Sequence, residues 1–117
     1  MQILIIEDDS NVRDLLTYGL QLEGHNVVVA EDFTHAQDLL DSGQNFQAIV
    51  SNLVLPRGRS GLDLLETMQN RGVSVLLMTG DTQTLMELER NGTPHLQKPF
   101  DLDELFSWLR KQSNDAE

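Results

Sequence analysis

Short apolar runs without alternation recur along the chain, and each stops abruptly at polar residues. A continuous apolar run is typical of a strand that is covered on both faces, as in a parallel sheet. The clearest runs are Ile3–Ile6, Ala48–Val50 and Val73–Met78, and the polar residues that follow them are Glu7-Asp8-Asp9, Ser51-Asn52 and Thr79-Gly80-Asp81. The pattern predicts strands at these three places. Two shorter strands are predicted at Asn26–Ala30 and at residues 93–97.

Segments with apolar residues at helical spacing separate these runs. The first segment carries Val12, Leu15, Leu16 and Leu20, with Tyr18 near the same face, and the last carries Leu102, Leu105, Phe106 and Leu109. The residues expected to cap the helices at their N-termini are Ser10, Asp32, Ser60 and Asp101. Strands that alternate with helices through short connections predict an α/β fold, a doubly wound parallel sheet of five strands and five helices. Residues 1–112 form one domain in this interpretation, and residues 113–117 are a polar tail or the start of a linker.

Composition narrows the class of protein. Lys and Arg number 8 against 19 Asp and Glu, a formal net charge of −11, so direct nucleic-acid binding by this domain is not expected. The absence of cysteine removes disulfides, thiolate metal sites and a thiol nucleophile. The apolar run Ile3–Ile6 is far too short for a signal peptide or a membrane span. We expect a soluble, cytoplasmic domain without a membrane partner.

Polar side chains follow four of the predicted strands. They are Glu7-Asp8, Asn52, Thr79 and Lys98. Because the carboxyl ends of parallel strands meet at one edge of the sheet, these side chains should converge on one crevice. Adjacent carboxylates suit Mg²⁺, a hydroxyl offers a donor, and a lysine offers a mobile positive charge for a phosphoryl oxygen or a carboxylate.

The same residues resemble the receiver domain of response regulators in bacterial two-component signalling. The matching stretches are ILIIEDD at residues 3–9, NLVLP at 52–56, LLMTGD at 76–81 and KPF at 98–100. Asn52 stands four positions before the proline of NLVLP. The resemblance covers residues 1–112 and implies a (βα)5 domain with strand order 2-1-3-4-5, the flavodoxin-like order. It implies a sensor histidine kinase or a phosphotransfer protein as partner, and a homodimer through the face formed by helix 4, strand 5 and helix 5.

Carried over residue by residue, the resemblance assigns the following roles. Glu7 and Asp8 match the acidic pair that holds Mg²⁺. Asn52 stands at the phosphoacceptor position and is expected among the metal ligands, and the Val54 backbone carbonyl would be a further one. Thr79 matches the switch hydroxyl, and Lys98 matches the lysine that contacts the phosphoryl group. The Lys98-Pro99 bond is expected to be cis.

Asn52 departs from the family pattern, in which an aspartate forms an aspartyl-phosphate. An amide cannot replace that nucleophile, because its nitrogen lone pair is delocalised and its oxygen is neutral. The sequence therefore predicts a receiver that is not phosphorylated here and has weakened Mg²⁺ binding, whether the asparagine is engineered or natural. The loop Pro56–Gly61 is one residue longer than usual, the interval from Thr79 to Lys98 is shorter, and His95 stands where receivers often carry a Tyr or Phe switch residue.

Two other function classes compete with a signalling module. A Mg²⁺-dependent phosphotransferase or phosphatase on a similar sheet also uses a carboxylate, a threonine and a lysine, but 117 residues leave no room for a substrate domain and the Asp-x-Asp spacing is absent. A flavin or nucleotide binder lacks a Gly-rich phosphate loop after the first strand, and acids there repel phosphate. We therefore expect no enzymatic activity and no catalytic residues.

Overall fold

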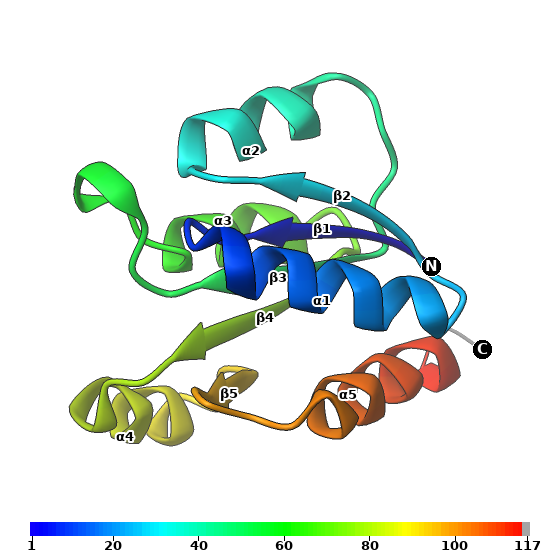
Figure 1. Cartoon of the computed structure of the whole chain (residues 1–117). Coiled ribbons are helices and arrows are strands. Elements are labelled where there is room, and N and C mark those ends of the chain that lie inside the picture. The colour runs from blue at the N-terminus through cyan, green and yellow to red at the C-terminus, as the bar shows by residue number, and fades with distance from the viewer. Residues whose placement is uncertain (116–117) are drawn as a thin grey trace.

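The computed structural model describes residues 1–115, and within them strands and helices alternate from end to end (Figure 1). Their bounds are β1 (Gln2–Ile6), α1 (Ser10–Leu22), β2 (Asn26–Ala30), α2 (Phe33–Asp41), β3 (Ala48–Asn52), α3 (Leu62–Gln69), β4 (Ser74–Thr79), α4 (Thr82–Arg90), β5 (His95–Gln97) and α5 (Leu102–Asp115). A 3₁₀ turn at Pro56–Gly58 lies between β3 and α3. The alternation predicted from the apolar runs is confirmed.

The five strands form one sheet in the order β2-β1-β3-β4-β5, and every neighbouring pair is parallel. This is the doubly wound (βα)5 fold that the resemblance implies. The register pairs Ile6 with Ser51, Asn52 with Met78 and Thr79 with Gln97. The carboxyl ends of β1, β3, β4 and β5 are therefore aligned at one edge of the sheet, where the arrowheads point in Figure 1.

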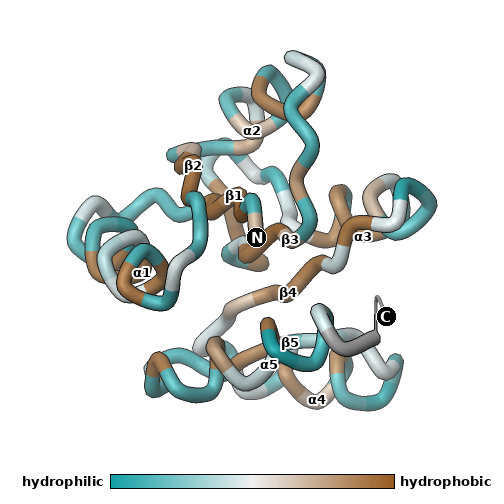
Figure 2. Tube along the Cα trace, turned by 90° about the vertical axis from the view of Figure 1, so that its right-hand side faces the viewer, coloured by the Kyte–Doolittle hydropathy of each residue, from teal (hydrophilic) through white to brown (hydrophobic). Residues whose placement is uncertain are grey.

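Helices cover both faces of the sheet, which explains the continuous apolar runs. In β1, Ile3 and Ile5 pack with buried residues of α1 and α5, whereas Leu4 and Ile6 pack with buried residues of α2, α3 and α4. All four side chains are fully buried. Figure 2, which looks along the strands, shows hydrophobic β1, β3 and β4 between α1 on one side and α2 and α3 on the other.

Helix N-termini follow the predicted capping chemistry, with two corrections. Asp9, rather than Ser10, caps α1, because its carboxylate accepts hydrogen bonds from the backbone N–H groups of Asn11 and Val12. Ser10 is the first helical residue. Asp32 caps α2 as predicted, since its carboxylate accepts the N–H of His35 at 2.8 Å.

The N-terminus of α3 is the second correction. Gly61 occupies the cap position predicted for Ser60, and the Ser60 hydroxyl accepts the N–H of Leu62 at 3.1 Å. At α5, the Glu104 carboxylate accepts the backbone N–H of Asp101 at 2.9 Å, which is the back-bond expected of a capping box.

The buried face of α1 is narrower than its periodicity predicts. Leu16 and Leu20 are buried, but Leu15 is 58% exposed and Tyr18 is 65% exposed. Only the side of α1 that meets the sheet and α5 is covered. The stripe of Leu15 and Tyr18 is a surface feature, and not part of the core.

The last helix extends further than predicted. It runs through Asp115, so residues 113–115 of the predicted polar tail are helical, while residues 116–117 lie outside the described part of the chain. Within residues 1–115, no helix has both the length and the apolar composition needed to cross a membrane.

Candidate functional site

Four polar residues meet at the carboxyl edge of the sheet, as the strand ends predict. Glu7 directly follows β1, Asn52 and Thr79 are the last residues of β3 and β4, and Lys98 follows β5. Glu7, Asn52 and Thr79 are unusual among polar side chains here because they are buried, with exposed fractions of 1%, 7% and 7%. Buried polar groups need partners inside the protein, so their hydrogen bonds define the site.

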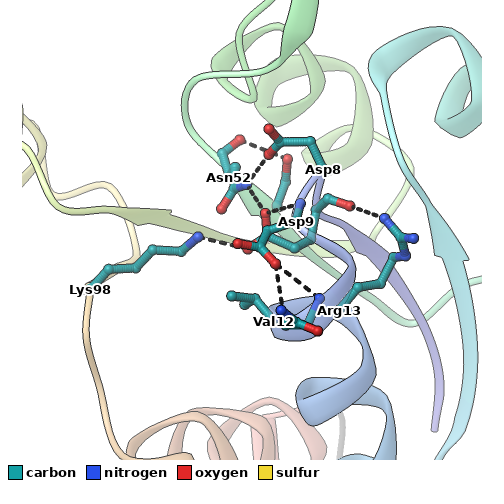
Figure 3. A network of polar contacts seen from close by, with 9 residues as sticks. Asp8, Asp9, Val12, Arg13, Asn52 and Lys98 are labelled. Atoms are coloured by element: carbon teal, nitrogen blue, oxygen red, sulfur yellow. Dashed lines mark hydrogen bonds and ion pairs between the residues drawn. The ribbon is translucent and has the colours of Figure 1, made fainter.

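The Asn52 carboxamide lies between the two acids. Its nitrogen donates to Oε2 of Glu7 and to Oδ1 of Asp8, the second at 3.0 Å (Figure 3). An amide nitrogen carries two hydrogens and a carboxylate only accepts, so this orientation satisfies both acids at once. The strand end thus presents donors, rather than a negative charge, to the acidic pair.

Glu7 is held from the other side by Lys98. The Lys98 ammonium lies 2.6 Å from Oε1 of Glu7, and its side chain is 30% exposed. The backbone N–H of Asp9 also donates to Oε2 of Glu7, at 3.2 Å. Nearly all acceptor capacity of this buried carboxylate is used by donors from three different segments.

Arg13 makes a contact at the same edge that sequence reasoning missed. Its guanidinium donates to the backbone carbonyl of Glu7 at 2.9 Å, so α1 is fastened to the end of β1 one turn after the helix begins (Figure 3). A single arginine on a helix gives no signal of this kind, since the partner is a backbone group.

Thr79 and Lys98 line a small cavity beside Asn52. The cavity has a volume of about 180 Å³, and its walls also include Val54, Met78 and Gly80. The Thr79 hydroxyl accepts the N–H of Asp81 at 3.2 Å, and the N–H of Lys98 donates to the Thr79 carbonyl at 2.9 Å. These bonds fix the ends of β4 and β5 next to each other, and the Lys98-Pro99 bond is cis, as expected.

Asp81 begins α4 directly after this cavity. Its carboxylate caps the helix and accepts hydrogen bonds from the hydroxyl and the N–H of Thr84. The hydroxyl of Thr84, followed by backbone N–H groups, holds the pKa of Asp81 below its usual value. The start of α4 therefore depends on an ionised carboxylate two residues from the candidate switch hydroxyl.

The long loop after β3 folds back on itself beside the site. Its antiparallel bridge joins Val54 to Ser60 and is closed by the bonds from Leu55 N–H to Arg59 O and from Gly61 N–H to Leu53 O. The Val54 carbonyl takes no part in this bridge, and the Val54 side chain is 74% exposed. Val54 lines the cavity beside Asn52, and its role as a metal ligand stays a prediction.

The two arginines of this loop bind to α2. Arg57 Nη2 lies 2.6 Å from Oδ2 of Asp32, and the Arg59 guanidinium stacks over the Phe33 ring at 3.8 Å from its centroid. Arg57 adopts a left-handed backbone conformation with φ 62°. These contacts join the loop to the start of α2, although the Arg57 side chain is still 68% exposed.

His95 lies in β5 and is partly buried, at the position assigned to a switch residue. Its ring Nδ1 donates to the Thr93 carbonyl at 2.7 Å, which ties the ring to the turn before the strand. The switch role of His95 stays a prediction. Trp108 of α5 is partly buried and packs against the core formed with α1.

The site as arranged does not fit a divalent cation. Magnesium needs oxygen ligands, but Asn52 directs its nitrogen at the oxygens of Glu7 and Asp8. The other amide atom, Oδ1, is buried and has no hydrogen-bond partner. Across residues 1–115, no group of three or more carboxylate, imidazole or thiol side chains is arranged to hold a metal ion.

Comparison with known proteins gives a consistent result. The response regulator receiver domain family matches residues 3–110. The response regulator protein PmrA of Pseudomonas aeruginosa is 37% identical over 115 residues, covering 94% of this chain and 51% of that protein. This chain spans about half the length of the curated relatives it matches.

Solved structures agree with the fold and with the family. The receiver domain of the Francisella response regulator 1452 superimposes with a TM-score of 0.82 at 25% identity, over 99% of this chain and 98% of that one. The response regulator TrrA of Thermotoga maritima, solved in complex with Mg²⁺ and BeF, superimposes with a TM-score of 0.80 at 27% identity, over 95% and 97% of the two chains.

Proposed function

This chain belongs to the response regulator receiver domain family of two-component signalling, and from that premise we propose that it is a receiver module that cannot be phosphorylated at its central position. The observation that supports the proposal is the place of Asn52 at the end of β3, between Glu7 and Asp8 and beside Thr79 and Lys98. In this family the corresponding group would be a carboxylate that attacks phosphorus.

The chemistry of the amide argues against phosphoryl transfer. Forming an aspartyl-phosphate requires a carboxylate oxygen with an available lone pair and negative charge, whereas the Asn52 oxygen is neutral and its nitrogen donates to two acids. The domain then lacks the group whose charge would pull Thr79 toward the cavity. Without that differential interaction, a two-state surface stays in its resting population.

Signalling through protein–protein contacts is the role that remains for such a module. We place the contact with a helix of a sensor histidine kinase or a phosphotransfer protein on α1, where Leu15, Tyr18 and Leu22 are 58%, 65% and 71% exposed. These positions follow i, i+3 and i+7 and form one stripe. A mostly apolar groove of about 320 Å³ continues the stripe through Pro99 to Lys98, so it reaches the site itself.

An apolar stripe that leads into a groove is the surface an amphipathic partner helix recognises. Because this groove reaches Lys98, a partner bound in it would also contact the crevice. A homodimer through α4, β5 and α5 is the alternative interface. Among the large apolar side chains described on that face, Met86 is the exposed one, at 58%.

We propose a signalling module rather than an enzyme, partly because Glu7 is not available as a nucleophile. A phosphotransferase or phosphatase would need a carboxylate free to attack, yet Glu7 is buried with its oxygens bound by Asn52, Lys98 and the Asp9 N–H. The family to which the chain belongs is a signalling family.

Phosphorylation with a small phosphodonor tests the proposal. The protein and its Asn52→Asp variant are incubated with acetyl phosphate and MgCl2, and intact mass and peptide mapping locate any added phosphoryl group. The unchanged protein is expected to gain none at residue 52, and the variant is expected to gain one there. Stoichiometric incorporation at residue 52 of the unchanged protein would sink the proposal.

A further inference from the structure

The acidic pair of this site has an internal bridge. One nitrogen, Asn52 Nδ2, donates to Oε2 of Glu7 and to Oδ1 of Asp8, and Lys98 supplies a positive charge to the remaining oxygen of Glu7 at 2.6 Å. Two carboxylates next to each other repel unless positive charge or donors lie between them. Here both kinds of partner come from the chain itself.

The observed orientation of the Asn52 carboxamide leaves one of its atoms without a hydrogen bond. Asn52 Oδ1 is buried and accepts no hydrogen bond, although a buried acceptor without a partner is unfavourable. Turning the amide over would direct Oδ1 at two carboxylates and leave both acids without their donor. The amide therefore keeps its nitrogen toward the acids even though its oxygen stays unsatisfied.

A divalent cation and this bridge exclude each other. A cation would have to lie between the oxygens of Glu7 and Asp8, which is the space that the amide hydrogens occupy. For Asn52 to act as an oxygen ligand, its carboxamide would have to turn over and give up both hydrogen bonds. Asn52 is thus a competitor of the cation in this arrangement, and not one of its ligands.

We propose that the Asn52 carboxamide takes the place of a divalent cation between Glu7 and Asp8, so that this domain holds its acidic site closed without metal. The bridge follows from the hydrogen bonds of the site and does not depend on the proposed signalling role. It predicts that Asn52→Ala binds metal more tightly than the unchanged chain. If Asn52 were only a weak ligand, Asn52→Ala would bind metal more weakly.

Manganese binding to three proteins distinguishes the two possibilities. The proteins are the unchanged chain, Asn52→Ala and Asn52→Asp, and free Mn²⁺ is measured by electron paramagnetic resonance. Because charge-assisted hydrogen bonds are strong, Asn52→Ala should bind Mn²⁺ at least about tenfold more tightly than the unchanged chain. Asn52→Asp should bind it most tightly. If Asn52 were a weak ligand, Asn52→Ala would bind more weakly than the unchanged chain, and the proposal would be overturned.

Thermal unfolding and NMR test the bridge without the Asn52→Ala variant, by measuring how the unchanged chain and Asn52→Asp respond to MgCl2. MgCl2 should leave the melting temperature of the unchanged chain and its Asn52 side-chain NH2 resonances in place, and should raise the melting temperature of Asn52→Asp by mass action. The resonances are identified by their loss in Asn52→Asp. Movement of the Asn52 NH2 signals with MgCl2 would contradict the bridge, and so would an Asn52→Asp variant as insensitive to MgCl2 as the unchanged chain.

Discussion

The Lys98 ammonium lies 2.6 Å from Oε1 of Glu7, so an ion pair joins the segment after β5 to the end of β1 across the carboxyl edge of the sheet. Glu7 is 1% exposed, and two strands, β3 and β4, separate the elements that the pair connects. A buried carboxylate of this kind depends on its partners, because water cannot replace them.

Removing the lysine should destabilise the fold more than removing both charges. We predict that Lys98→Met lowers the free energy of unfolding by roughly 3 kcal/mol, since it leaves a buried carboxylate short of its counter-charge. The double variant Glu7→Gln with Lys98→Met should lose clearly less than the sum of the two single variants. Urea unfolding of the four proteins gives the coupling energy, and additive single losses would contradict a coupled pair.

Gly61 allows the close approach of α3 to the end of β3. A Cβ added there would lie 2.5 Å from the Asn52 carbonyl oxygen and 2.9 Å from a Leu77 methyl carbon. Because backbone atoms of a buried strand cannot move away easily, Gly61→Ala should lower the free energy of unfolding by about 1–3 kcal/mol. It should also shift the backbone NMR signals of Asn52.

Gly19 is the matched control for this substitution. Its added Cβ would meet the tip of the Leu102 side chain at 2.8 Å, and a side chain can turn aside. Alanine also gains roughly 1 kcal/mol of helix propensity over glycine in α1. Gly19→Ala should therefore cost much less than Gly61→Ala, and equal losses by urea unfolding would show that backbone proximity is not the cause.

Acid titration of Asp32 tests how the loop after β3 is fastened to α2. The N–H of His35, and next the hydrogen bond from Arg57, hold the pKa of Asp32 below its usual value. A depressed folded-state pKa means that this carboxylate stabilises the fold above its unfolded pKa of about 3.9, and that the contribution is lost as pH falls through the lower folded value.

Carbon-detected NMR of the Asp32 carboxyl group during an acid titration should show directly that its pKa in the folded protein is lowered. Because the backbone N–H is the larger cause, Arg57→Gln should raise the pKa of Asp32 only part of the way to its ordinary value. A complete return to the ordinary value in Arg57→Gln would show that the ion pair, and not the helix cap, controls this carboxylate.

The exposed stripe on α1 gives a binding prediction. Replacing Leu15 and Leu22 together by serine should weaken the capture of a helical phosphorelay partner at least about tenfold, because each buried leucine contributes roughly 1.5–3 kcal/mol on docking. Stability should change little, since these side chains are 58% and 71% exposed. Met86→Ser on the opposite interface is the control, and a larger loss with Met86→Ser would move the interface to α4.

The sequence predicted the sheet and the positions of its polar ends, for a clear physical reason. Unbroken runs such as Ile3–Ile6 require cover on both faces, and a parallel sheet puts Glu7, Asn52, Thr79 and Lys98 at one edge. The order of the strands came from family resemblance, because alternation alone does not distinguish the arrangements of a doubly wound sheet.

Details that depend on neighbours in space were not predictable. Leu15 has the spacing of a core residue, but it lines an open groove and is 58% exposed. Ser10 has good capping chemistry but follows Asp9, whose carboxylate accepts the free N–H groups instead. The direction of the Asn52 amide depends on two acids that arrive from another strand. No local pattern contains that information.

The response of the Thr79 and Lys98 backbone amides to beryllofluoride, a phosphoryl mimic, shows whether a site with Asn52 can hold a phosphoryl group. In ¹H–¹⁵N spectra recorded with MgCl2 and beryllofluoride, we predict that both signals stay in place in the unchanged protein and move in Asn52→Asp. Movement of both signals in the unchanged protein would mean that a site with asparagine at position 52 still accepts the phosphoryl group, and the proposed function would be wrong.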